Sequence, residues 1–310
     1  MQKDYLKIME KEKHKLKQTL RGERFVNVPK IKEVQDVLEQ QVVADTFYVR
    51  GSGQATKELI EVETLHRKWV SEIIDLSDFP YCYFTNGTTD AIHHWRMTET
   101  RPWQKLCYGE YQYMDMIGPE GSVCCDVPGQ YMKDGRSAIP AVIDKDKPLY
   151  ISIPSAADGN FFNPQKRGPI EAPVILDCTY IGATDIQKID VPKNTEQVFF
   201  SFSKGFGMVG QRLGLVYTKE PHPSLERLKS VECWNYNGVQ LISQIIGVIP
   251  VDGMWKKYRE KQLEVCKEYD LTPSDCYFLA TTKDPYYKER RRMRWNDNAR
   301  ICITPLLGNL

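Results

Sequence analysis

The sequence lacks the features of a membrane-spanning or exported protein. Its longest uncharged stretch, residues 233–251, is interrupted by asparagine, glutamine, serine and proline. A membrane-spanning helix instead needs about 20 predominantly apolar residues. The first 18 residues are rich in lysine and contain no apolar core of the kind found in signal peptides. We therefore expect a cytoplasmic protein that makes no contact with a membrane.

Paired metal-binding or redox cysteines are also missing. The nine cysteines include no C-x-x-C pair, so the sequence indicates neither a zinc site nor a dithiol redox motif. Several of them lie in apolar runs, as Cys82 and Cys302 do, where a free thiol behaves as a small hydrophobic side chain. These features favour a reducing compartment over a disulfide-stapled secreted protein, which is the alternative. His93 and His94 are adjacent and point in different directions on a helix, so we expect no metal site.

Neither sign of charge is in excess. The 42 lysines and arginines nearly balance the 41 aspartates and glutamates, giving a formal net charge of +1. A general nucleic-acid-binding protein would carry a clear basic excess, so we expect no nucleic-acid partner. The 310 residues, 41% of them hydrophobic, are enough to bury a large core, and their number suggests about two domains.

Short apolar runs alternate with helical segments over the first two thirds of the chain. The runs that we expect to form strands are residues 81–85, 148–153, 172–180, 197–203 and 213–218. Apolar residues at helical spacing predict an amphipathic helix over residues 56–75, and a second helix over residues 90–97. Strands that alternate with helices predict an α/β fold, in which helices cover both faces of a mostly parallel sheet.

The pattern changes near residue 221. Helical segments with a break at Pro250 precede two short strands at residues 277–282 and 299–304, which predicts a smaller α+β unit. We therefore predict three parts. Residues 45–220 form the large domain, residues 221–310 form the C-terminal small domain, and residues 1–44 form an N-terminal arm or helical segment that joins the small domain.

The most informative stretch is SFSKGFGMVGQRLG, residues 201–214. Lys204 directly follows an apolar strand and precedes several glycines and Arg212. If this lysine is buried, its pKa should fall, and a neutral lysine amine is the nucleophile that imine chemistry needs. A flexible glycine-rich loop with a solvated lysine is the alternative interpretation.

Polar residues also follow two other predicted strands. Asp177 and Tyr180 end the run 172–180, and open α/β sheets bind ligands at the C-terminal ends of their strands. Residues 86–89, NGTT, lie between a strand and a helix, where free N–H groups can bind phosphate. A strand-end turn and ordinary helix capping are the alternatives for these two sites.

A phosphate-binding turn, an acidic residue and a lysine, in this order on successive βα units, suit pyridoxal phosphate. Residues 45–305 resemble the fold type I pyridoxal-phosphate enzymes, and within them the class I/II-like aminotransferases. The resemblance is most specific at the pattern S-x-S-K-x-x-x-x-x-G-x-R-x-G, which residues 201–214 match at every fixed position. It implies a large cofactor-binding domain with a smaller domain beside it.

The resemblance implies three catalytic residues, which also contact the cofactor. Lys204 resembles the lysine that forms the internal aldimine, a Schiff base with pyridoxal 5'-phosphate, and then shuttles the proton. Asp177 resembles the carboxylate that keeps the pyridine nitrogen protonated. Tyr180 resembles the phenol that bonds the ring oxygen.

The resemblance also implies a set of phosphate ligands. These are Ser201, Arg212, Gly87, Thr88 and Thr89, of which Arg212 supplies charge-assisted hydrogen bonds.

Three further residues carry softer assignments. Tyr111 best matches the aromatic residue that stacks on the ring, with Tyr108 and Tyr113 as alternatives. Arg300 resembles the arginine that clamps the substrate α-carboxylate. Tyr48 resembles a tyrosine that reaches the phosphate of the neighbouring subunit, which implies a homodimer with shared active sites. The alternative for the tyrosines is core packing. The alternative for Arg300 is that it belongs, with the arginines of residues 290–294, to a basic face exposed to solvent.

The sequence departs from the family at one turn. The usual N-P-x-G turn, whose asparagine bonds the ring oxygen, falls within residues 154–160, where Ala156 occupies the aligned place and Asn160 is the candidate substitute. We expect an aminotransferase that moves an amino group between an α-amino acid and a 2-oxo acid. The departure leaves open a β- or γ-lyase, a decarboxylase or an amino-acid cyclase with the same cofactor. A non-catalytic regulatory homologue is the less favoured reading.

Overall fold

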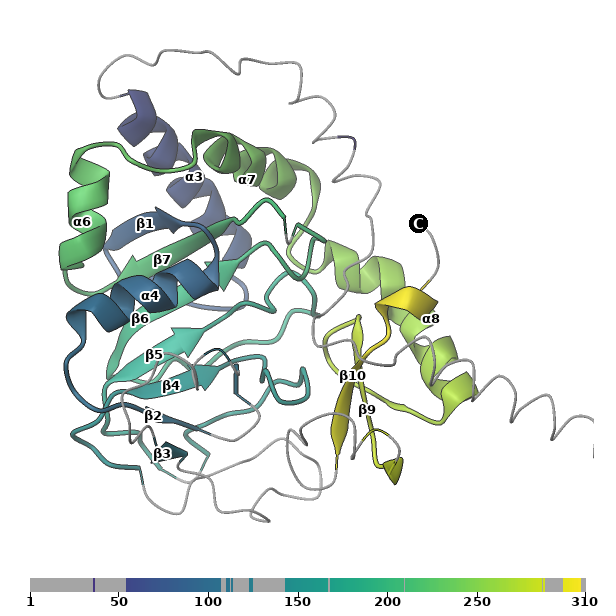
Figure 1. Ribbon diagram of the computed structural model, residues 1–310. Helices are drawn as coiled ribbons and strands as arrows, with labels where there is room; N and C mark the ends of the chain where they lie inside the picture. Colours follow the sequence, from purple (N-terminus) through teal and green to yellow (C-terminus); the bar gives the residue numbers. More distant parts are fainter. Residues whose placement is uncertain are drawn as a thin grey trace, which may run out of the picture.

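The structure is a computed structural model. It describes residues 36, 54–106, 110, 111, 113, 123–124, 143–166, 168–208, 210–285, 287 and 298–307. A large mixed sheet with helices packed around it stands beside a small sheet (Figure 1). Within the described ranges, no helix combines the length and the apolar character needed to cross a bilayer.

Seven strands form the large sheet, in the order β1-β7-β6-β5-β4-β2-β3. They are β1 (Tyr81–Thr85), β2 (Gln104–Lys105), β3 (Val123–Cys124), β4 (Leu149–Ser152), β5 (Val174–Asp177), β6 (Thr195–Ser201) and β7 (Gly214–Thr218). β3, β2, β4, β5 and β6 pair in parallel, whereas β7 is antiparallel to both of its neighbours. Since parallel strands end at the same edge, Ser152 at the end of β4 pairs with Asp177 at the end of β5. This edge carries the site described below.

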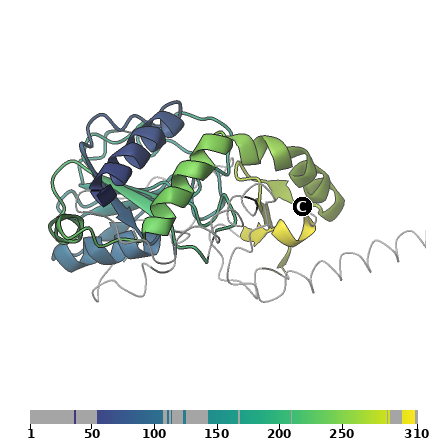
Figure 2. The ribbon, with the colours of Figure 1, turned by 90° about the horizontal axis from the view of Figure 1, so that it is seen from above.

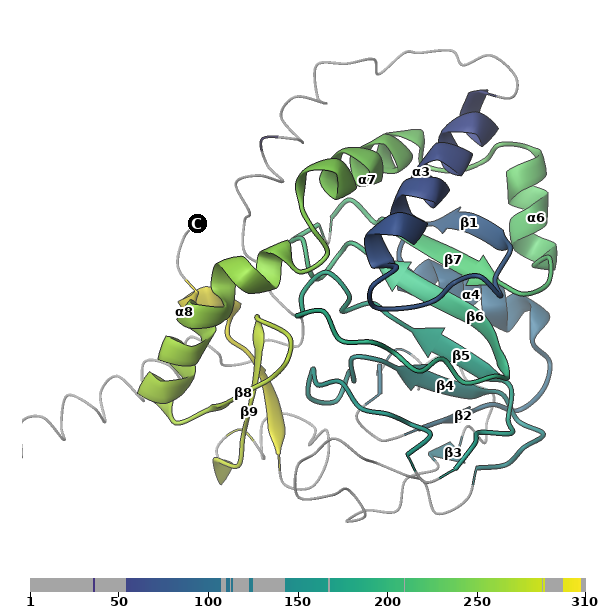
Figure 3. The same cartoon turned by 180° about the vertical axis from the view of Figure 1, so that it is seen from behind.

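Alternation along the strands produces two hydrophobic cores, one on each face of the sheet. In β5, Val174 and Leu176 belong to one core and Ile175, between them, belongs to the other. The first core includes apolar residues of α3 (Gln54–Val70) and α7 (Tyr236–Val248), and the second includes those of α4 (Thr88–Thr98) and α6 (Pro223–Ser230). In Figure 1, α4 lies in front of the sheet, and in Figure 3, seen from behind, α3 lies in front of it.

The small sheet has three antiparallel strands in the order β10-β9-β8. They are β8 (Thr272–Pro273), β9 (Leu279–Thr282) and β10 (Ala299–Cys302), and a short 3₁₀ helix, η1 (Thr304–Leu306), follows β10. α8 (Gly253–Tyr269) leads from α7 to this sheet, as the view from above shows (Figure 2).

Backbone hydrogen bonds join the small sheet to the loops of the large one. In the loop of residues 274–277, the Cys276 N–H donates to the Gly159 carbonyl (3.1 Å) and the Tyr277 N–H donates to the Ala183 carbonyl (3.0 Å). The two units therefore meet where β4 and β5 end, which is the edge that carries Asp177.

The predicted fold class is confirmed, with helices on both faces of a mostly parallel sheet and a small second sheet. The predicted strands and helices fall within a few residues of the observed elements, and the helical segment does break around Pro250. The reversed direction of β7 was not predicted, because its sequence, GLVYT, suits either direction.

The domain boundaries stay predictions. All but one of the residues of the predicted 1–44 segment, and its end, lie outside the described residues. The predicted boundary at residue 221 is followed by α6 and α7, and both helices pack on the large sheet. α6 contacts α4, and α7 contacts α3. These contacts favour a boundary later than residue 220, near the start of α8.

Candidate active site

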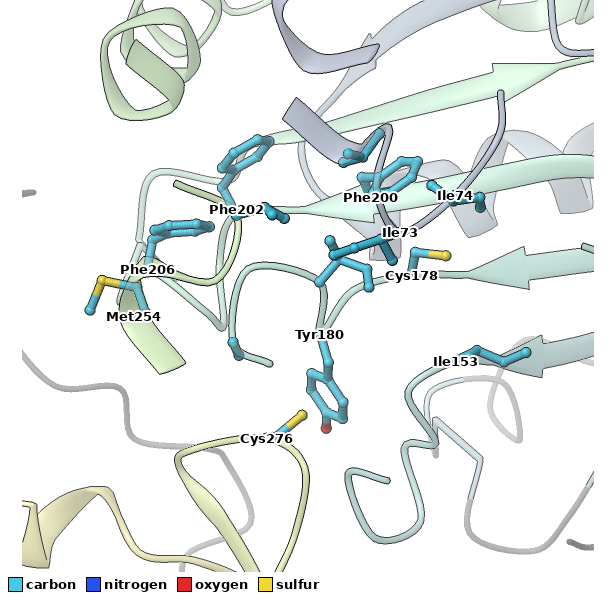
Figure 4. Close-up of a cluster of buried hydrophobic side chains, with 14 of the residues drawn as sticks. Ile73, Ile74, Ile153, Cys178, Tyr180, Phe200, Phe202, Phe206, Met254 and Cys276 are labelled. Carbon is cyan, nitrogen blue, oxygen red and sulfur yellow. The ribbon is translucent and has the colours of Figure 1, made fainter. Parts of the chain in front are cut away.

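Lys204 lies in the turn that follows β6. Phe202 and Phe206 fix this turn, because both are buried in the core and their rings stack with centroids 5.5 Å apart (Figure 4). The Tyr277 hydroxyl, from the loop between β8 and β9, adds a hydrogen bond to the carbonyl of Gly205 (2.9 Å). Burial, followed by the positive charge of Arg300, lowers the pKa of Lys204 to about 8. The turn thus holds the partly buried lysine amine that the sequence argument required.

Gly87, Ser201 and Arg212 meet at the start of α4. Gly87 has φ of +83°, and a Cβ built there would lie 3.5 Å from the Arg212 guanidinium and 3.6 Å from Ser201 Oγ. Arg212 itself has φ of +53°, an uncommon conformation for a residue with a side chain. Such backbone conformations cluster at ligand sites, where the surrounding structure compensates their cost. Three of the predicted phosphate ligands are therefore neighbours, although they come from three separate segments of the chain.

The two threonines at the start of α4 face different partners. Thr88 Oγ1 is hydrogen-bonded to Thr179 Oγ1 (2.6 Å), and Thr89 Oγ1 to the hydroxyl of Tyr111 (3.1 Å). The residue that caps α4 is Gly87, so no side chain of the capping residue accepts a hydrogen bond from the first N–H groups of the helix. Tyr111, the predicted stacking residue, is thereby held beside the predicted phosphate turn.

Asp177 ends β5 as a buried carboxyl group, with 4% of its surface exposed. Its Oδ1 accepts a hydrogen bond from the Thr179 N–H (2.9 Å) and another from the Thr179 hydroxyl (2.5 Å), and its Oδ2 accepts one from the Tyr150 hydroxyl. Burial nevertheless raises the pKa of Asp177, since these hydrogen bonds oppose it only in part. A cationic N–H placed against this carboxyl group would favour its ionised form.

Tyr180 and Arg300 join the two sheets at the site. The Arg300 side chain, from β10, donates through Nη1 to the Tyr180 hydroxyl (2.7 Å) and to the carbonyl of Ala156 (2.6 Å). Figure 4 shows the Tyr180 side chain leaving the core toward the loop that carries Cys276. Arg300 therefore contacts the predicted cofactor-binding residue Tyr180, and its positive charge contributes to the lowered pKa of Lys204.

The side chain of Asn160 bonds residues outside the predicted cofactor-binding set. Its amide Nδ2 donates to Asp158 (2.9 Å), and its Oδ1 accepts the N–H of Asp275 (2.9 Å). This geometry gives no support to the prediction that Asn160 replaces the family's ring-oxygen ligand. Tyr48 and Tyr108 lie outside the described residues, and their assignments stay predictions.

Three polar residues that lie at the site were not assigned from the sequence. Tyr150 and Thr179 bond Asp177 directly, and the Ser203 hydroxyl is buried without a hydrogen-bond partner among the described residues. Ser203 could have been found, because it lies inside the matched S-x-S-K pattern. Tyr150 could not, because only the parallel pairing of β4 with β5 brings it to Asp177.

Comparisons with protein-family models and with curated protein sequences find no match. A comparison with solved structures finds enzymes of similar architecture. A probable N-succinyldiaminopimelate aminotransferase from Thermus thermophilus is 16% identical, with a TM-score of 0.64 and 97% of each chain covered. The histidinol-phosphate aminotransferase from Sinorhizobium meliloti, solved in complex with pyridoxal-5'-phosphate, is 14% identical, with a TM-score of 0.62 over 95% of this chain and 91% of that one.

The chain has the fold of these aminotransferases. An L-threonine-O-3-phosphate decarboxylase from Porphyromonas gingivalis is also similar, at 15% identity and a TM-score of 0.52 over 84% of this chain and 95% of that one. At such identities the likeness establishes the fold, and the chemistry has to be argued from the site.

The residues at this site fit pyridoxal phosphate. The space beside Gly87 is lined by a guanidinium and a hydroxyl, which are suitable partners for a phosphate group. The Ser203 hydroxyl, which has no hydrogen-bond partner within the described part of the chain, and the first N–H groups of α4 add hydrogen-bond donors. Asp177 offers a carboxylate to the ring nitrogen, and Lys204 offers an amine of lowered pKa.

Proposed function

We propose that the protein is a pyridoxal-phosphate-dependent aminotransferase that moves an amino group between an α-amino acid and a 2-oxo acid. The placement of Lys204 carries the proposal: it follows β6, whose last residue, Ser201, lies with Arg212 beside Gly87. The charges of Arg300, the predicted carboxylate clamp, and of Arg212, at the predicted phosphate turn, both contribute to the lowered pKa of this lysine.

When bound, pyridoxal phosphate supplies a conjugated ring that accepts the electron pair of a bond broken at the substrate α-carbon. The chain's own residues perform the remaining tasks. Lys204, in its neutral form, is the base that takes the α-proton and returns it. Asp177 would hold a proton on the ring nitrogen, and Tyr180 would offer its hydroxyl to the ring oxygen. Tyr111 would pack against the ring face.

Substrate orientation falls to Arg300. A guanidinium presents paired N–H donors that match the two oxygens of a carboxylate, and this match favours an α-amino acid over a simple amine. Because Arg300 comes from the small sheet and Asp177 from the large one, the substrate would bind where the two units meet.

The decisive test is covalent labelling. Purified protein mixed with pyridoxal phosphate should gain a visible absorbance band that borohydride bleaches, and mass spectrometry should then locate the reduced cofactor on Lys204. The Lys204→Ala variant should show neither signal. Lys219→Ala serves as a matched control, because Lys219 follows β7 and its Nζ bonds the Lys193 carbonyl at the surface.

The outcomes separate clearly. A protein that takes up no pyridoxal phosphate, or that carries the label on another lysine, contradicts the proposal. Turnover by Lys204→Ala at the parent rate contradicts the assignment of Lys204. Screening the common amino acids for loss of the visible band, with formation of the pyridoxamine form, then identifies the amino donor.

The turn of residues 154–160 motivates a second reaction class. Ala156 occupies the place of the family's asparagine, and the side chain of Asn160, the candidate substitute, bonds Asp158 and Asp275. A lyase, a decarboxylase or a cyclase would use the same Lys204 and Asp177. Release of ammonia or carbon dioxide without accumulation of pyridoxamine phosphate would favour this class over transamination.

Two further parts of the proposal rest on the sequence. The resemblance supports a homodimer with shared active sites, in which Tyr48 reaches the partner's phosphate, and the N-terminal residues and the cysteine pattern support a cytoplasmic location. Sedimentation equilibrium tests the first part. A monomer with full activity, or a Tyr48→Phe variant with unchanged affinity for pyridoxal phosphate, would contradict it.

A further inference from the structure

A second buried carboxyl group lies near Asp177 and takes no part in the proposed reaction. Glu110 has no exposed surface. Burial raises the pKa of Glu110 to about 8, hydrogen bonds from Ser152 act against that rise, and the charge of Asp177 adds to it. Keeping such a group inside a protein is costly, so its hydrogen bonds have to be strong and well placed.

The hydrogen bonds of Glu110 hold the end of β4. Its Oε1 accepts the N–H of Ser152 (3.3 Å), and its Oε2 shares a hydrogen bond with Ser152 Oγ. The same Oγ accepts the N–H of Ala156 (2.8 Å). Glu110 therefore fixes both ends of the five-residue turn 152–156, one directly and one through a hydroxyl.

The other side of that turn holds Arg300. The Ala156 carbonyl accepts from Arg300 Nη1, which also donates to Tyr180, and one guanidinium nitrogen has the two protons that both bonds need. The sequence places Ala156 where the resembling family has an asparagine side chain. Here a backbone carbonyl contacts the arginine, and a carbonyl can only be positioned through the turn that carries it.

We propose that Glu110 is a positioning residue that fixes the guanidinium of Arg300 through Ser152 and Ala156. The substrate carboxylate then meets the arginine in a single orientation. This inference deepens the proposed function, since it rests on Arg300 being the carboxylate clamp. The charged or titratable groups that face Glu110 are Asp177 from β5, Tyr150 from β4 and Lys105 from β2.

The test uses the apoprotein, so that it does not depend on turnover. Phenylglyoxal modifies accessible guanidinium groups, and peptide mass spectrometry reports the rate at each arginine. Ser152→Ala and Glu110→Leu break the connection, and Arg300 should be modified at least about fivefold faster in both, the factor that about 1 kcal/mol provides. Glu110→Gln should stay near the parent rate, because an amide can bond both the N–H and the Oγ of Ser152.

A matched control uses another carboxylate that accepts a hydroxyl hydrogen bond. Glu226 of α6 bonds the Tyr83 hydroxyl (2.6 Å) on the α4 side of the large sheet, away from Arg300. Glu226→Leu should therefore leave the Arg300 rate unchanged. Circular dichroism checks that each variant folds, and the Arg212 rate provides an internal reference.

Holoprotein measurements complete the test. With the amino donor that the proposed screen identifies as substrate, Ser152→Ala should raise KM about fivefold and change kcat less than about twofold, because the arginine orients a carboxylate that does not react. Unchanged Arg300 modification in both Ser152→Ala and Glu110→Leu would overturn the inference. Failure to bind pyridoxal phosphate would instead overturn the proposed function, while the labelling result on the apoprotein would still be readable.

Discussion

The reactivity of Lys204 provides the most quantitative prediction. With a pKa of about 8, roughly one Lys204 in ten is a neutral amine at pH 7, whereas at the ordinary lysine value of 10.5 fewer than one in a thousand would be. The apoprotein should therefore react at Lys204 on the order of a hundredfold faster at pH 7 than an unperturbed lysine would allow. Burial is the larger cause, and the charge of Arg300 is the next.

Competitive labelling with trace acetic anhydride measures this directly. The acetylation rate of Lys204 is followed against pH by mass spectrometry, with the exposed Lys57 as a reference for surface reactivity. We expect the midpoint near pH 8. Arg300→Gln removes a nearby positive charge, so the midpoint should move to higher pH and the rate at pH 7 should fall severalfold. Arg227→Gln, on the surface of α6, is the control and should leave the curve in place.

Two results would refute this reasoning. A midpoint near 10 in the parent apoprotein would mean that the lysine is solvated, as in the flexible-loop interpretation of residues 201–214. A midpoint near pH 8 that does not change in Arg300→Gln would agree with burial as the cause of the lowered Lys204 pKa. It would also show that the arginine of β10 does not lie close to Lys204.

Three further predictions concern stability and cofactor binding. Because Lys204 binds its proton less tightly in the folded than in the unfolded chain, apoprotein stability should rise between about pH 8 and 10.5. Lys204→Met should therefore raise the unfolding free energy at pH 7 by about 3 kcal/mol in urea titrations. Glu110 should change the stability in the opposite direction. Its pKa is raised from 4.5 to about 8, so the stability should fall as the pH rises across that window. A dependence of stability on pH that is the same in Glu110→Gln as in the parent would contradict this. Gly87→Ala introduces a Cβ 3.5 Å from Arg212 at a φ of +83°, and equilibrium dialysis should show affinity for pyridoxal phosphate reduced about tenfold or more, whereas unchanged affinity would place the phosphate elsewhere.

A last prediction separates binding from chemistry at Asp177. Asp177→Asn keeps the size of the side chain and its hydrogen bond to the Thr179 N–H, but loses the charge that holds a proton on the ring nitrogen. We expect the variant to bind pyridoxal phosphate and to lose about 10²- to 10³-fold in kcat. Parent-like turnover would show that the ring nitrogen contacts another residue.

Much of the site could be predicted because its signals are local. The Lys204 turn, the 86–89 turn and Asp177 each follow a short apolar run, and the strand-then-turn order is visible in the sequence alone. β5 and β6 pair in parallel, and β1 runs in the same direction because β7, which lies between β1 and β6, is antiparallel to both, so the three strands end at one edge. Local pattern and sheet geometry were together sufficient for these residues.

The remaining features depend on contacts between distant segments. Glu110 reaches the site only because it packs beside the end of β4, 42 residues further along the chain. Asn160 was assigned from its place in a turn, but Asp275, 115 residues away, determines where its amide points. The direction of β7 likewise depends on the assembled sheet, since a short apolar run does not indicate whether its strand will pair in parallel or antiparallel.

The bonds of the 274–277 loop bear on how a ligand could enter. Cys276 and Tyr277 are tied through their N–H groups to loops of the large sheet, and the Tyr277 hydroxyl reaches the carbonyl of Gly205, next to Lys204. The same loop is tied to the small unit, because Gln262 of α8 donates to the carbonyls of Ser274 and Cys276. A movement of the small sheet away from the large one would therefore have to break the hydrogen bonds of Cys276 and Tyr277, and it would disturb the turn that carries Lys204.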